Sequence, residues 1–112
     1  NINKASDKKK INEICSFVID NFQNDIYLHD VADIAHMTRP AFCRFFKKET
    51  NKTFFSYLNE VRIGYACKLL IDDSFSISQI ALESGFNTIS YFNRQFKKIM
   101  DQTPSHYRSR FK

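Results

Sequence analysis

Glycine, proline and tryptophan are scarce in this sequence: its 112 residues include two glycines, two prolines and no tryptophan. Glycine and proline mark the many turns of β-sandwiches and barrels, so their scarcity favours a helical protein. No apolar run approaches the roughly 20 residues that span a bilayer, and no signal-peptide pattern opens the chain. The sequence therefore argues against a membrane protein and against a β-rich secreted domain.

The cysteines are few and cannot form a recognisable framework. Cys15, Cys43 and Cys67 are odd in number and far apart, and the three histidines form no ligand set with them. We therefore expect no disulfides, no metal and no cofactor, and a cytoplasmic location. The sequence also shows no catalytic carboxylate pair, no nucleophile beside a base and no glycine-rich phosphate loop, so we expect no enzyme activity.

Positive charge is in excess, with 17 Lys and Arg against 12 Asp and Glu, a net charge of +5. A basic balance favours a polyanionic partner, although a merely soluble basic domain has the same composition. Apolar residues make up 43% of the chain and include 12 phenylalanines. That is enough for a hydrophobic core in one small domain, or in two very small subdomains that share a helix.

Residues 76–107, SISQIALESGFNTISYFNRQFKKIMDQTPSHY, contain the most informative pattern. A short apolar helix, a turn at Gly85 and a second helix are predicted there. The second helix has an apolar side and a basic side: Phe92, Phe96 and Ile99 on the first, and Ser90, Arg94 and Lys97 on the second. Two short helices that meet at a glycine turn, the second with a basic free face, are typical of a helix-turn-helix.

The same pattern occurs earlier in the chain. A short helix over 28–35, a turn at His36 and Met37, and a helix from the cap Thr38 to about Thr50 form another corner of two helices, the first of the two corners in the chain. FCRFFKK (42–48) aligns with FNRQFKK (92–98) at a shift of 50, which pairs Arg44 with Arg94. Generic helical hairpins explain the matched phenylalanines, but core packing does not require the matched arginine and lysines.

The remaining periodicity predicts an all-α protein with seven helices and no strand. We expect a linker over 1–6, with Ser6 or Asp7 capping a helix to about Phe22, and a final helix from Pro104 to about Arg110. The predicted domains are a first helix-turn-helix subdomain (7–52), a long linking helix (53–73) and a second helix-turn-helix subdomain (74–112). A helix of that length spans about 27 to 30 Å. Adjacent major grooves are about 34 Å apart, so one chain could read two of them.

These motifs resemble the DNA-binding domain of the AraC/XylS family of bacterial transcription regulators. The resemblance rests on DVADIAHMTRPAFCRFFKKETNKTFFSYLNEVR (30–62), R-I-x-x-A-x-x-L-L (62–70) and IALESGFNTISYFNRQFKKIMDQTPSHYR (80–108). It implies sequence-specific binding to double-stranded DNA and a role in transcriptional activation. It also implies RNA polymerase as a further partner and an N-terminal effector-sensing or dimerising domain outside this sequence.

The resemblance also implies which residues read bases: Arg39, Pro40, Cys43 and Arg44 on the first recognition helix, and Ile89, Ser90, Asn93 and Arg94 on the second. From charge and helix position we add candidates for backbone contacts: Thr38, Lys47, Asn87, Thr88 and Lys97. Pro40 and Cys43 donate hydrogen bonds poorly, so we expect sharper base reading by the second helix. His36 and Asn51 replace glycines that are usual in the family, at positions where left-handed backbone is expected.

Two alternatives remain open at this point. The first is a helical protein-interaction module that docks an acidic partner through the same basic faces. Salt-sensitive binding to duplex DNA separates the two, since only a DNA-binding domain requires it. The second concerns single residues: the two arginines could form surface salt bridges, and we expect Arg62 to pair with a carboxylate.

Overall fold

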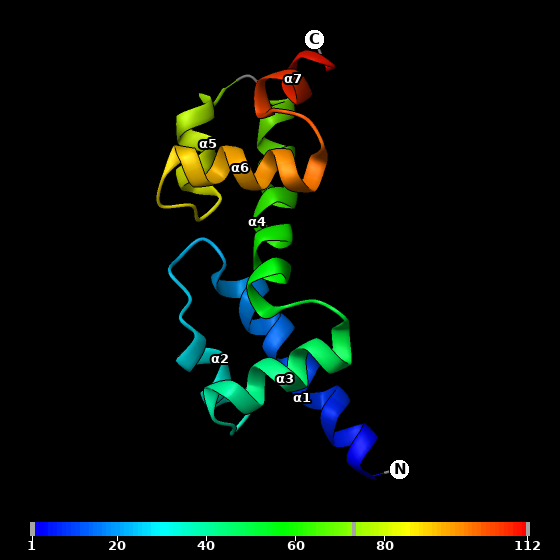
Figure 1. Cartoon of the computed structure of the whole chain (residues 1–112). Coiled ribbons are helices and arrows are strands. Elements are labelled where there is room, and N and C mark those ends of the chain that lie inside the picture. Colours follow the sequence, from blue (N-terminus) through cyan, green and yellow to red (C-terminus); the bar gives the residue numbers. More distant parts are fainter. Residues whose placement is uncertain (1, 73, 112) are drawn as a thin grey trace. The chain divides into compact units, whose positions relative to one another are not determined.

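The structure is a computed structural model that describes residues 2–72 and 74–111. These residues form seven helices and no strand (Figure 1), which confirms the predicted fold class. The helices are α1 (Ile2–Asn21), α2 (Leu28–Ile34), α3 (Arg39–Thr50), α4 (Phe54–Ile71), α5 (Ile77–Glu83), α6 (Ile89–Met100) and α7 (Pro104–Ser109). Within the described ranges no helix is long and apolar enough to cross a membrane. The chain divides into two compact units between Leu58 and Asn59, inside α4.

Side-chain caps fix where the helices begin. Thr38 Oγ1 accepts from the Ala41 amide at 3.3 Å, and Thr88 Oγ1 accepts from the Tyr91 amide at 3.1 Å. Ser76, Thr53 and Thr103 cap α5, α4 and α7 in the same way. Each cap satisfies an amide that would otherwise have no partner within its helix. The caps that the sequence predicts at Thr38, Thr53, Ser76 and Thr103 are confirmed, and Thr88 is a further cap.

The turn inside each corner has the same geometry in both units. His36 and Gly85 have positive φ values of 57° and 97°. The following amide donates back to the helix: Met37 N to Ala32 O at 2.9 Å, and Phe86 N to Ala81 O at 3.0 Å. This is the Schellman ending, in which one left-handed residue lets the chain reverse. The left-handed backbone expected at His36 is confirmed.

Both longer corner helices also end on a left-handed residue. Asn51 ends α3 with φ 62° and donates its amide to Lys47 O at 2.8 Å. Asp101 ends α6 with φ 58° and donates to Lys97 O at 2.9 Å. Asparagine and aspartate tolerate this conformation better than most residues other than glycine. The predicted role of Asn51 as a helix end is confirmed.

Aromatic packing holds the first unit together. Phe42, Phe46 and Phe54 are buried, and their ring centroids lie 5.5 to 5.8 Å apart. The Phe46 ring also lies 5.7 Å from that of Tyr57, which is half-buried. Ile14 and Val18 of α1 are fully buried in the same unit. The apolar side of α3 is therefore fixed, and its other side is left for solvent.

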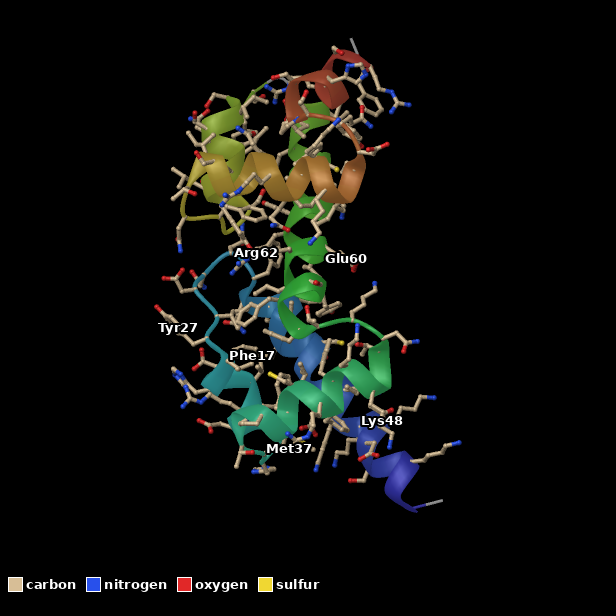
Figure 2. The ribbon with its side chains drawn as sticks, viewed as in Figure 1. Phe17, Tyr27, Met37, Lys48, Glu60 and Arg62 are labelled. Carbon is tan, nitrogen blue, oxygen red and sulfur yellow. The ribbon has the colours of Figure 1, made fainter. Side chains whose placement is uncertain are left out.

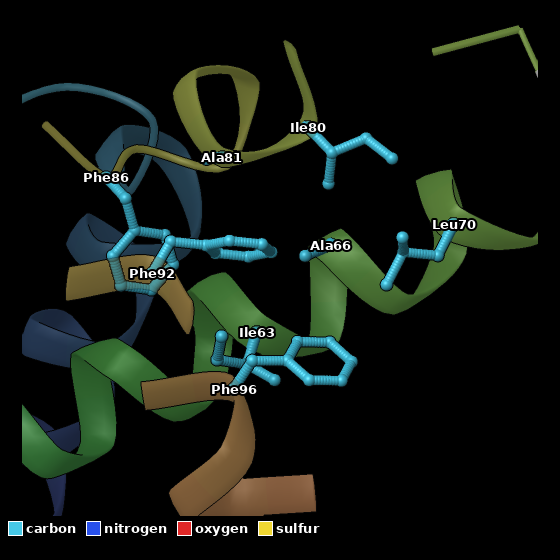
Figure 3. Close-up of a cluster of buried hydrophobic side chains, with 8 residues drawn as sticks. All are labelled: Ile63, Ala66, Leu70, Ile80, Ala81, Phe86, Phe92 and Phe96. Atoms are coloured by element: carbon cyan, nitrogen blue, oxygen red, sulfur yellow. The ribbon is translucent and has the colours of Figure 1, made fainter. Parts of the chain in front are cut away.

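The second unit repeats this packing. Figure 3 shows Phe92 and Phe96 of α6 among Ile63 and Ala66 of α4 and Ile80 of α5. The Phe92 and Phe96 centroids are 5.8 Å apart, and Phe96 lies 5.7 Å from Tyr107. The matched pairs Phe42–Phe46 and Phe46–Tyr57 have the same two separations in the first unit. The internal repeat is thus a repeat of packing as well as of sequence.

One predicted helix boundary is wrong, and another lies outside the described residues. Helix α1 begins at Ile2, so neither Ser6 nor Asp7 is its N-cap, and the segment predicted as a linker continues the helix as far as it is described. Lysine and alanine are good helix formers, and the segment has no glycine or proline to stop the helix. Helix α4 runs unbroken through Gly64, as predicted. The predicted end of the linking helix at Asp73 lies outside the described residues, and the division into domains stays a prediction.

Candidate nucleic-acid interface

All thirteen residues proposed from the sequence are exposed in the structure. They lie on the two corner helices and at the residues that lead into them: Thr38, Arg39, Pro40, Cys43, Arg44, Lys47, Asn87, Thr88, Ile89, Ser90, Asn93, Arg94 and Lys97. The opposite sides of α3 and α6 carry the four phenylalanines with no exposed area, Phe42, Phe46, Phe92 and Phe96. Each helix therefore separates a packed aromatic side from a polar, cationic side. The roles of these thirteen residues in binding stay predictions.

The exposed side of α6 carries polar side chains from its first turn to its last, beside the exposed Ile89. With 100° of rotation per residue, one side of the helix carries four polar residues: Ser90, Asn93, Arg94 and Lys97. The cap at Thr88 leaves the helix N-terminus, with its positive dipole end, at the start of this surface. Lys97 and Lys98 lie in the last turn, where cations offset the opposite dipole end. The surface can therefore accept an anion at its start and offers donors along its length.

Arg94 lies over an aromatic ring. Its guanidinium carbon is 5.6 Å from the centroid of Tyr91, three residues earlier on α6. Within residues 2–72 and 74–111, neither Arg94 nor Arg44 has a carboxylate partner. Among the described residues, neither of these two matched arginines is engaged in a surface salt bridge. Both guanidinium groups remain able to form a bidentate contact with guanine or phosphate.

The exposed side of α3 contains two poor hydrogen-bond donors. Pro40 has no amide hydrogen and Cys43 has only a weak thiol donor, whereas Arg39, Arg44 and Lys47 are strong donors. Lys47 Nζ donates to the Asn51 carbonyl at 3.4 Å, which helps to close the end of the helix. This bond is a structural use for one of the lysines expected to touch DNA.

A shallow depression of about 260 Å³ borders the start of α6. It is lined by Arg62, Gly85, Phe86, Asn87, Thr88 and Tyr91. Arg62, on α4 (Figure 2), lies with its guanidinium carbon 6.0 Å from the Phe86 ring centroid. The expected pairing of Arg62 with a carboxylate stays a prediction.

Sequence reasoning missed Tyr91 and Asn59. Tyr91 is 38% exposed, and its hydroxyl accepts a hydrogen bond from Asn59 Nδ2 at 3.0 Å. Asn59 is on α4 and only 7% exposed. The available signal was the helical angle of Tyr91, which at 100° per residue lies between the core phenylalanines and Arg94. Its partner could not be found in this way, because the two residues are 32 positions apart.

The cysteines lie in two different environments. Cys15 and Cys67 are half-buried beside Tyr57 and Tyr107, whereas Cys43 is exposed on α3. Burial raises the pKa of Tyr57, and a hydrogen bond with Cys15 raises that pKa further. Burial likewise raises the pKa of the Cys67 thiol. A raised thiol pKa opposes thiolate formation, so Cys67 serves packing. Across 2–72 and 74–111, no three His, Cys, Asp or Glu side chains gather as metal ligands.

Comparison with known proteins gives a consistent picture. The sequence matches a family profile described as a helix-turn-helix domain over residues 31–110. It is 34% identical over 110 residues to the HTH-type transcriptional activator RhaR of Mannheimia succiniciproducens, covering 97% of this chain and 40% of that protein. The chain thus spans less than half the length of this relative.

Two solved structures have the same fold. One is a transcriptional regulator of the AraC-type DNA-binding domain-containing proteins from Chromobacterium violaceum, with a TM-score of 0.83, 27% identity and 96% of each chain covered. The other is the DNA-binding domain of the global transcriptional factor AdpA in complex with a target DNA. Its TM-score is 0.82 at 22% identity, with 89% of this chain and 90% of that one covered. The chain belongs to the AraC-type helix-turn-helix domain family.

Proposed function

We propose that this chain binds double-stranded DNA sequence-specifically, as the DNA-binding domain of a bacterial transcription regulator, with α3 and α6 as its two recognition helices. The observation that carries the proposal is the repeated division of these helices into a buried phenylalanine side and an exposed cationic side. Arg44 and Arg94 occupy the same place in the two copies. Core packing gives no reason for that match, and major-groove reading does.

The two helices have unequal parts in this proposal. On α6, Arg94 contacts a guanine edge and Asn93 an adenine edge, while the first turn and Lys97 hold backbone phosphates. On α3, Arg44 is the main base contact, and Pro40 with Cys43 offers apolar surface to thymine methyl groups. The half-site that α3 reads is therefore less sharply specified than the half-site that α6 reads.

The likeness to known proteins supports the same proposal. RhaR is a transcriptional activator, and the AdpA domain was solved with its target DNA. Activation of transcription by this chain's full protein, contact with RNA polymerase, a cytoplasmic location and an N-terminal effector or dimerisation domain are parts of the proposal. So is the absence of a catalytic activity.

Selection of duplexes from a random pool by the 112-residue chain tests this function. We expect an enriched sequence with two half-sites about one helical turn, 10 to 10.5 base pairs, apart. We also expect affinity to fall steeply as salt rises, because cationic side chains release counterions from the phosphates. If no sequence is enriched and duplex binding is insensitive to salt, the basic surfaces serve an acidic protein partner instead.

A further inference from the structure

A buried amide connects α4 with the exposed side of α6. Asn59 Nδ2 donates to the Tyr91 hydroxyl at 3.0 Å and to Gln95 Oε1 at 3.3 Å. Asn59 itself is 7% exposed, and both bonds are partly buried. A buried side-chain amide is costly unless it is hydrogen-bonded, and here both of its N–H groups have acceptors. The arrangement therefore fixes the position of Tyr91 on the helix.

The bond from Asn59 also determines in which hydrogen bond the Tyr91 hydroxyl accepts and where it can still donate. An amide nitrogen only donates, so the phenol oxygen acts as the acceptor in this pair. The proton of the phenol then points elsewhere, and in the described parts of the chain no acceptor takes it. Tyr91 is 38% exposed, so an acceptor on a partner molecule can reach that proton.

The Tyr91 ring in turn supports Arg94. The guanidinium carbon lies 5.6 Å from the ring centroid, a distance at which a cation is attracted to the aromatic face. A flexible arginine loses fewer conformations on binding when it is already held in place. Asn59, Tyr91 and Arg94 thus form a continuous series from the interior of the second unit to its exposed surface.

We propose that Tyr91 is a further DNA-contacting residue, whose ring orients Arg94 toward the bases and whose hydroxyl donates to a backbone phosphate, with Asn59 as its positioning residue. This inference rests on the proposed function of α6. A phosphate is the acceptor because Tyr91 lies at the edge of the reading face, 60° around the helix from Arg94 toward the core side. Phosphates border the groove that such a face enters, and they accept hydrogen bonds from tyrosine.

The first unit lacks this arrangement, which makes it an internal control. At the shift of 50 that aligns the two helices, Ala41 takes the place of Tyr91 and Phe45 that of Gln95. Ala41 has no ring to support Arg44 and no hydroxyl to donate. The structure thus gives α6 an oriented arginine that α3 does not have, in agreement with sharper base reading by α6.

The test uses the whole 112-residue chain, a duplex obtained by selection and a scrambled duplex, with dissociation constants measured over a range of salt concentrations. Tyr91→Phe keeps the ring and removes the hydroxyl. We expect about tenfold weaker binding to both duplexes, as for one lost hydrogen bond to a charged group. The ratio of the two dissociation constants, scrambled to selected, should stay unchanged. Tyr91→Leu removes the ring as well, and we expect the ratio itself to fall.

Double substitutions separate orientation from a general loss of structure. In an Arg94→Ala background, Tyr91→Leu should leave the ratio where Arg94→Ala put it, because no arginine remains to be oriented. In an Arg44→Ala background, Tyr91→Leu should keep its full effect on the ratio. Asn59→Ala should weaken DNA binding in the otherwise unmodified chain and have little further effect in a Tyr91→Leu background. The unfolding of each variant is followed in parallel.

The outcomes distinguish this inference from the proposed function. Should the unmodified chain show no preference for the selected duplex, the proposed function fails and the inference with it. Should the chain and Arg94→Ala behave as proposed while Tyr91→Phe and Tyr91→Leu bind like the unmodified chain, the inference alone is overturned. It is also overturned if Tyr91→Leu lowers the ratio equally with and without Arg94.

Discussion

Ser84 is a buried polar residue at the end of α5. It has no exposed area, and its hydroxyl has no hydrogen-bond partner within residues 2–72 and 74–111. A buried hydroxyl without a partner costs about 1 to 3 kcal/mol. At the matching position of the first corner the chain has Ala35, which is equally buried. The fold thus already accommodates alanine at this place.

Ser84→Ala should therefore raise the free energy of unfolding by about 1 kcal/mol, since it removes the unpaired hydroxyl and leaves the packing intact. Denaturant unfolding measures the change. Ser78→Ala, at an exposed position of the same helix, is the control and should alter stability much less. A clear loss of stability in Ser84→Ala would mean that the hydroxyl has a partner in solution.

The left-handed residues of the two turns predict opposite substitutions. His36 adopts φ 57°, a conformation that costs a residue with a Cβ about 1 to 2 kcal/mol, whereas Gly85 adopts φ 97° without that cost. His36→Gly should stabilise the protein and Gly85→Ala should destabilise it, each by about 1 kcal/mol. Thermal unfolding of both variants measures the pair. If both shifts had the same sign, the two turns would not be equivalent.

At the scale of the element, α4 contains an exposed glycine that no turn requires. Gly64 lies within the helix, and a Cβ added there would meet nothing within 4 Å. Glycine in a helix interior costs about 0.5 to 1 kcal/mol relative to alanine. Gly64→Ala should increase the free energy of unfolding by that amount and leave DNA affinity unchanged. Unchanged or lower stability would show that α4 is interrupted in solution.

The contact between α1 and α4 predicts a pH dependence. The pKa of Tyr57 is raised above its ordinary value near 10 by burial and by Cys15, so the folded state holds the phenol proton more tightly than the unfolded chain does. Its contribution to stability is therefore complete below pH 10 and is lost as the pH rises toward the folded-state pKa. Tyr107 and Cys67, whose pKa values are also raised, act in the same direction.

Tyr57→Phe should accordingly make stability fall less steeply above pH 10, because one group that must ionise on unfolding is gone. Denaturant unfolding between pH 8 and pH 11 in the presence of a reductant measures the slope. Tyr27→Phe is the matched control, since Tyr27 is 56% exposed and projects from the chain (Figure 2). Equal slopes for both variants would show that the Tyr57 proton is not held by the fold.

At the scale of the whole molecule, the sequence predicted the features that repeat. Phe42, Phe46 and Arg44 have counterparts at a constant shift, so periodicity alone separated the buried side of each helix from the exposed side. Capping residues such as Thr38 were found because their chemistry is local: the threonine and the amide it accepts from are three residues apart. The fold class followed from these two signals. The eight base-reading positions came from the resemblance to the AraC/XylS family, and the other five came from charge and helix position.

Contacts between distant segments could not be predicted in this way. The bond from Asn59 to Tyr91 depends on how α4 packs against α6, and nothing in the local sequence of either residue marks it. The early start of α1 was missed for a different reason. The mostly polar segment 3–10 has no apolar period from which a helix can be predicted.

The central claim, that α6 reads bases through Arg94 while Lys97 holds a phosphate, is tested most directly by a salt titration of two variants. Arg94→Ala and Lys97→Ala are compared with the unmodified chain on the selected and the scrambled duplex. Arg94→Ala should lower the preference for the selected duplex about tenfold or more, as expected for the loss of one bidentate base contact. Lys97→Ala should weaken binding to both duplexes alike and reduce the salt slope by about one. An unchanged preference in Arg94→Ala would contradict the account.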